Sequence, residues 1–113
     1  MGEIFVVNRR SDWGNTKAKR VLIMRPSALG NPFPIGAKYT RETCIEAYRV
    51  WLWQKMQAVD ERVMVALENI AGHIEDGFDV HLVCCCAPLA CHGDVVKAAV
   101  EWMMAENAKA RQA

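Results

Sequence analysis

Short apolar runs alternate along this chain with longer segments in which apolar residues recur at helical spacing. The runs are rich in β-branched and aromatic residues, which favours β-strands. They predict three strands, at Ile4–Val7, Val21–Met24 and Phe78–Cys85. Because Val21–Met24 is apolar throughout, we expect a strand that is buried on both faces.

The helical spacing predicts three helices, each of which starts at a residue suited to cap it. Thr40 and Asp60 have side-chain oxygens that can accept a hydrogen bond from the first turn, and glycine favours a helix end. Between the second strand and the first helix, prolines and glycines exclude any regular element. The predicted helices run from Thr40 to Gln57, from Asp60 to Gly72 or Gly77, and from His92–Asp94 to Glu106.

The predicted element order is β-β-α-α-β-α, that of a small α/β domain with a single sheet. We expect the domain to occupy residues 1–106, followed by a polar tail over residues 107–113. Ligands of open α/β sheets bind beyond the carboxyl ends of strands. Functional residues are therefore expected in the loops that follow the second and third strands, although the pattern leaves open how the strands pair.

Composition fits this picture, since 113 residues with 52% hydrophobic and 24% charged residues form one globular domain. No apolar run approaches the roughly 20 residues that span a bilayer, and the first residues do not form a signal peptide. The net charge of +1 divides into +5 over residues 1–50 and −4 over residues 51–113. The basic half is consistent with an anion-facing side or with a solvated sheet edge.

The five cysteines are an odd number in a chain without a signal peptide, which predicts a reducing, cytoplasmic location rather than a disulfide framework. Four of them fall within eight residues, between Cys84 and Cys91. This crowding makes the loop after the third strand the first place to look for chemistry.

The loop Arg25–Phe33 has the residues of an anion site. A guanidinium can bind a phosphate in a fork, a serine hydroxyl can donate to it, and a Gly-Asn turn can offer backbone amides. The alternative is a rigid connector. The predicted ligand-binding residues are Arg25, Ser27, Gly30 and Asn31, with Arg41 from the start of the first helix.

The loop Cys84–Asp94 is open to three interpretations. Three thiolates and an imidazole, from Cys84, Cys86, Cys91 and His92, are a legitimate zinc set, although their spacing is not that of a zinc finger. Alternatively, Cys91 is a nucleophile at a helix N-terminus, with His92 and Asp94 as catalytic companions. The third interpretation is that the cysteines are buried core thiols and that His92 caps the helix.

The four tryptophans do not suggest sequence-specific DNA binding, because no aromatic and basic repeat accompanies them. Trp51 and Trp102 fit helical core positions, whereas Trp13 and Trp53 are expected to be partly exposed.

Together the two loops resemble a small phage-associated and bacterial family of unknown function. Its first motif, Arg-Pro-Ser-x-x-Gly-Asn-Pro-Phe, matches residues 25–33, and its second, Cys-x-Cys-x-Pro-x-x-Cys-His-Gly-Asp, matches residues 84–94. The resemblance covers roughly residues 4–103. It departs at Cys85, where the family has Trp, and in a longer spacer before Phe78. It implies a phage or mobile-element setting and a cytoplasmic location, including the host cytoplasm, but no particular reaction.

We therefore expect one shared site at the carboxyl edge of the sheet. The first hypothesis is that it binds a small, phosphate-bearing, nucleotide-like anion, with processing of that ligand left open. The second is a non-enzymatic, zinc-stabilised module that binds and modulates a host protein. The third is covalent catalysis by Cys91 in hydrolysis or group transfer. The sequence leaves the oligomeric state open.

Overall fold

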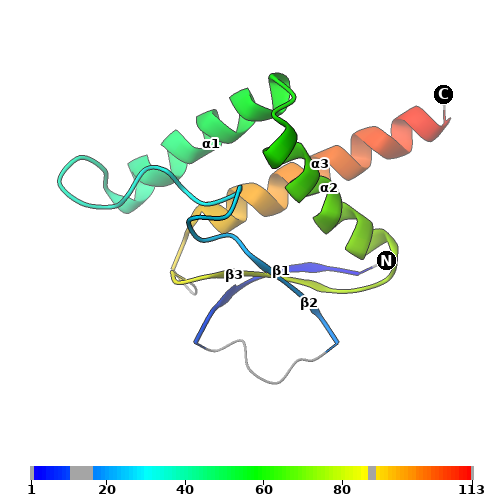
Figure 1. Cartoon of the computed structure of the whole chain (residues 1–113), viewed down its shortest axis with the longest axis horizontal. Coiled ribbons are helices and arrows are strands. Elements are labelled where there is room, and N and C mark those ends of the chain that lie inside the picture. Colours follow the sequence, from blue (N-terminus) through cyan, green and yellow to red (C-terminus); the bar gives the residue numbers. More distant parts are fainter. Residues whose placement is uncertain (1, 11–16, 87–88, 113) are drawn as a thin grey trace.

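The computed structural model describes residues 2–10, 17–86 and 89–112, and its elements follow the predicted order. Figure 1 shows a single sheet with the helices gathered on one side of it. The elements are β1 (Ile4–Asn8), β2 (Lys19–Leu22), α1 (Arg41–Gln57), α2 (Glu61–Glu75), β3 (Val80–Cys84) and α3 (His92–Gln112).

The three strands are parallel and lie in the order β1-β3-β2. Val80 at the start of β3 pairs with Ile4 on one side and Lys19 on the other. Because all strands run the same way, their carboxyl ends meet at one edge. The loops that follow β2 and β3 are thereby brought to the same place, as the fold prediction required.

The core lies between the sheet and the helices. Val80, Leu82 and Cys84 of the central strand are almost completely buried. The apolar stripe of α2 faces this core, since Val63, Leu67, Ile70 and Ile74 recur at helical spacing and are all buried.

The prediction that the second strand is buried on both faces is wrong. β2 starts at Lys19 and its residues alternate between half-buried and exposed, with Leu22 60% exposed. The physical reason is its position at the edge of a sheet on which the described helices cover one face. Ile23, just after the strand, is the fully buried member of the predicted run.

The last helix is longer than predicted, because α3 continues past Glu106 to Gln112. Residues 107–112 are exposed and include good helix formers without glycine or proline to stop them. Arg111 pairs with Glu75 on α2, with 3.3 Å between guanidinium nitrogen and carboxylate oxygen.

The expected core position of Trp102 is wrong, since its side chain is 47% exposed. Trp53 is partly exposed, as predicted. Trp13 lies outside the described residues.

The helix starts are confirmed at atomic level. The side chains of Thr40 and Asp60 accept hydrogen bonds from the backbone N–H of Thr43 and Val63. Gly77, with a φ of +92°, follows the end of α2 in the left-handed region that glycine tolerates best. Among the described helices, none is both long enough and apolar enough to cross a bilayer.

Candidate functional site

The two predicted loops meet at the carboxyl edge of the sheet, where they surround a cavity of about 440 Å³. Of the residues singled out in the sequence, the cavity brings together Arg25, Asn31, Cys84, Cys86 and His92. Its other lining residues are Met24, Phe33, Pro34, Ile35, Cys44 and Cys85. The remaining predicted site residues, Ser27, Gly30, Arg41, Cys91 and Asp94, do not line it.

The first loop is folded on itself by backbone hydrogen bonds. The N–H of Ser27 donates to Met24 O at 2.9 Å, and the N–H of Gly30 donates to Ser27 O at 3.0 Å. A Cβ at Gly30 would lie 2.8 Å from the backbone of Arg25, so glycine is required by close approach. These amides are therefore used inside the loop rather than offered to an anion. The buried Ser27 Oγ has no hydrogen-bond partner within the described parts of the chain.

The side chain of Asn31 stabilises the same loop through two hydrogen bonds. Its Nδ2 donates to Cys44 Sγ at 3.0 Å, and its Oδ1 accepts the N–H of Phe33 at 2.8 Å. The Cys44 thiol in turn donates to Phe33 O at 2.7 Å. Cys44 lies at a core position of α1, and helical spacing contains no signal for its contacts with this loop.

Tyr48 of α1 connects the first loop to the start of α3. Its hydroxyl donates to Leu29 O at 2.8 Å, and its ring meets the His92 ring edge-on with centroids 4.9 Å apart. Burial raises the pKa of Tyr48, so the hydroxyl remains a donor at neutral pH. A buried tyrosine needs a hydrogen-bond partner for its hydroxyl. The position of Tyr48 in the apolar face of α1 was therefore the one sequence feature that could have indicated a contact between α1 and a loop.

His92 is hydrogen-bonded to the backbone just after β2. Its Nε2 lies 2.6 Å from Ile23 O, and since a carbonyl accepts, this nitrogen carries the proton. Burial lowers the pKa of His92, which is therefore neutral at physiological pH. With Nε2 held by the backbone, the ring is a structural link between the end of β2 and the start of α3.

Cys91 takes the N-cap position of α3, because its Sγ accepts the N–H of Gly93 at 3.2 Å. It also lies 3.4 Å from Cys84 Sγ, and both thiols are free and buried. Burial raises the pKa of Cys91 to about 12, outweighing the hydrogen bond from Gly93. Because burial disfavours the thiolate, the surroundings of Cys91 do not favour the activated nucleophile of the third hypothesis.

Three of the four residues considered for zinc line the cavity, but they do not form a metal-binding group. In the described parts of the chain, no three histidine, cysteine or acidic side chains form a group that could hold a metal ion. His92 points its Nε2 at a backbone carbonyl, and only Cys84 and Cys91 have their sulfurs in contact. The described residues therefore do not fit a zinc centre.

Arg41 and Asp94 support the second loop rather than the cavity. A guanidinium nitrogen of Arg41 donates to Ala90 O at 3.0 Å. Burial raises the pKa of Cys86, while a hydrogen bond from Arg41 opposes that rise. Asp94 is exposed in the first turn of α3, where a carboxylate is favoured by the helix dipole.

Arg25 is the one cation that lines the cavity among the described residues. It is exposed, it lines the cavity, and it is the only charged side chain among the described lining residues. Phe33, Pro34 and Ile35 give the cavity an apolar wall. The cavity therefore combines one guanidinium with a surface suited to a planar, weakly polar group.

Comparison with known proteins gives one match. Residues 6–102 match the family described as "Domain of unknown function (DUF4326)". Neither the curated proteins nor the solved structures give a significant match to the chain. The family match covers both loops that form the cavity.

Proposed function

The chain belongs to the DUF4326 family, and we propose that its carboxyl-edge cavity binds a nucleotide-like ligand through a single phosphate. The observation that carries the proposal is the position of Arg25, an exposed guanidinium beside an apolar wall in a cavity built by both loops. A guanidinium binds phosphate oxygens in a bidentate fork. The apolar wall at Phe33 would cover one face of a base or a similar ring.

The charge of the cavity favours a monophosphate over a triphosphate. Arg25 is one positive charge, and the loop amides of Ser27 and Gly30 are already hydrogen-bonded to carbonyls. Among the described lining residues there is no carboxylate that could hold the Mg²⁺ that accompanies a triphosphate. A volume of about 440 Å³ is in the range of small-molecule sites.

The proposed activity is binding rather than catalysis. Cys91, the nucleophile candidate, is a buried helix cap whose pKa is raised by burial. We place this function in a reducing cytoplasm, either of a bacterium or of a phage-infected host. Free thiols persist there, and the Cys84 and Cys91 sulfurs are unbonded at 3.4 Å. Control of a host protein by the ligand-bound form is compatible with this proposal.

Isothermal titration calorimetry with AMP, GMP, CMP and UMP tests the proposal. We expect one-to-one binding of at least one of them, no tighter binding of ATP with Mg²⁺, and weaker binding of inorganic phosphate alone. Loss of a charge-assisted hydrogen bond costs about 1.5–3 kcal/mol, so Arg25→Ala should weaken binding by about tenfold or more. Arg62→Ala, which removes an exposed arginine of α2 outside the cavity, is the matched control.

Two results would contradict the proposal. One is the absence of binding heat with all four monophosphates at millimolar concentration. The other is an Arg25→Ala protein, folded by circular dichroism, that binds as the unaltered protein does.

A further inference from the structure

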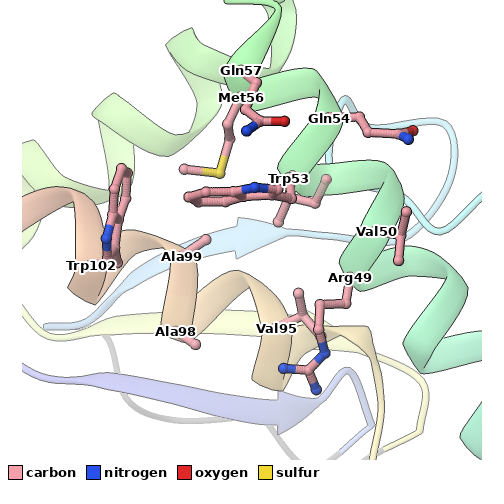
Figure 2. A pocket seen from close by; sticks show the side chains of 11 residues that line it. Arg49, Val50, Trp53, Gln54, Met56, Gln57, Val95, Ala98, Ala99 and Trp102 are labelled. Carbon is pink, nitrogen blue, oxygen red and sulfur yellow. The ribbon is translucent and has the colours of Figure 1, made fainter.

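A second hollow lies between α1 and α3 and shares no lining residue with the cavity at the sheet edge. Its volume is about 530 Å³. Figure 2 shows Trp53 and Met56 of α1 above a floor made by Ala98 and Ala99 of α3, with Trp102 closing one end. We call this hollow the tryptophan groove.

We propose that the tryptophan groove binds a small aromatic anion, a planar ring system that bears one acidic group. This site is independent of the nucleotide-like ligand proposed above, since the two hollows are lined by different residues.

The two indoles provide the ring-binding surface. Trp53 and Trp102 are 45% and 47% exposed, which is unusual for such large apolar side chains, and exposed apolar groups that gather in a groove mark binding sites. Their ring centroids are 5.2 Å apart and their planes make an angle of 76°. A planar ring that enters the groove can stack on one indole while it meets the other edge to face, the two geometries that aromatic pairs prefer.

The charge of the groove favours a ligand that bears an acidic group. Arg49 is the only ionisable side chain among the described lining residues, and it lies at the opposite end of the groove from Trp102 (Figure 2). Its ion pair with Glu46, at 3.2 Å, is solvent-exposed on both sides. An exposed pair of this kind contributes little, so Arg49 can turn to a ligand at small cost. A cationic ligand would meet no carboxylate in the groove.

The size of the hollow argues for a small molecule as its occupant. The volume of about 530 Å³ is within the range of small-molecule sites.

The test uses two fluorescent probes that differ in one charge. 8-Anilinonaphthalene-1-sulfonate has the ring system and an acidic group, and N-phenyl-1-naphthylamine has the same rings without the acid. We expect the sulfonate to bind with one-to-one stoichiometry, and Trp53→Ala and Trp102→Ala each to weaken it at least tenfold. Phe78→Ala, which removes an aromatic side chain 41% exposed elsewhere, should leave it unchanged.

The Arg49→Gln variant tests the charge separately. It should weaken the sulfonate at least threefold and leave the uncharged probe unchanged. Circular dichroism confirms folding, and Trp53→Phe and Trp102→Phe replace any alanine variant that does not fold; each should weaken the sulfonate by a smaller factor.

Three results would overturn the proposal. The first is that the sulfonate still binds with unchanged affinity to both tryptophan variants. The second is that Arg49→Gln weakens both probes equally. The third is that light scattering shows a dimer and that Trp102→Ala dissociates it. The last would assign the groove to a second copy of the chain.

Discussion

The cavity at the sheet edge and the tryptophan groove have similar volumes, about 440 and 530 Å³, but are built in opposite ways. Around the cavity, the side chains of Asn31, Tyr48 and His92 are hydrogen-bonded inside the protein. The groove lies between α1 and α3, and its tryptophans are half exposed. The difference teaches that most residues of a polar motif maintain the shape of a site, and that few remain to contact a ligand.

Substitution of one aromatic residue from each region would test this comparison with the largest expected effect. Tyr48→Ala removes a buried ring, its contact with His92 and its bond to Leu29 O. We expect a loss of about 3–5 kcal/mol in the free energy of unfolding. Trp53→Ala should cost only about 1–2 kcal/mol, because its ring is already half exposed. Urea denaturation of both variants measures this, and equal losses would contradict the contrast.

Alkylation rates compare a buried structural cysteine, Cys91, with an exposed one, Cys85, in the same region. Burial raises the pKa of Cys91, so this thiol carries much less of the reactive thiolate at neutral pH than an exposed cysteine does. Cys85 is exposed and should react first with iodoacetamide. Mass spectrometry after a time course gives the site-specific rates, and in urea the two cysteines should react alike. Equal rates in the folded protein would restore Cys91 as a nucleophile.

Two glycines test how tightly the first loop is packed. Gly30→Ala would place a methyl group 2.8 Å from the backbone of Arg25, and overpacking costs about 1–3 kcal/mol. Gly36→Ala meets nothing within 4 Å and should leave stability within about 0.5 kcal/mol. Thermal unfolding of the pair measures the difference. If both variants melt alike, the loop is not held as the structure indicates.

Acid should weaken the cavity region through His92, with the smallest of these effects. Its folded-state pKa is below the ordinary value of about 6.5, because burial disfavours the charged ring. As pH falls below about 6.5, the unfolded state therefore binds more protons, and the free energy of unfolding decreases. Urea denaturation between pH 7.5 and 5 measures the slope, which His92→Gln should reduce. A slope of the opposite sign, or one unchanged in the variant, would contradict this account.

Most of the fold could be predicted because its signals are local. The caps at Thr40 and Asp60 and the stripe of α2 depend on residues close in sequence, and they placed the helices correctly. The burial of β2 was misjudged because an apolar run does not show whether a strand is central or at an edge. The end of α3 was misplaced because polar residues such as Lys109 continue a helix as well as they form a tail.

The location of the cavity could also be predicted, but the role of each residue could not. Parallel strands bring loops to one edge, which follows from topology alone. Whether Asn31 points outward or bonds Cys44, thirteen residues away, depends on tertiary packing. No sequence motif predicts the tryptophan groove. Trp53 and Trp102 belong to different helices, and no local sequence pattern shows that these two helices bring them together.

The most direct test of the central claim is an NMR titration of ¹⁵N-labelled protein with the nucleoside monophosphate that binds best. We predict that the amide shifts of residues 24–35 and 84–86 change, together with the Arg25 guanidinium signal, while the Trp53 and Trp102 indole signals stay in place. Changes that gather at the indoles, or no change near Arg25, would contradict the claim that the cavity at the sheet edge is the phosphate-binding site.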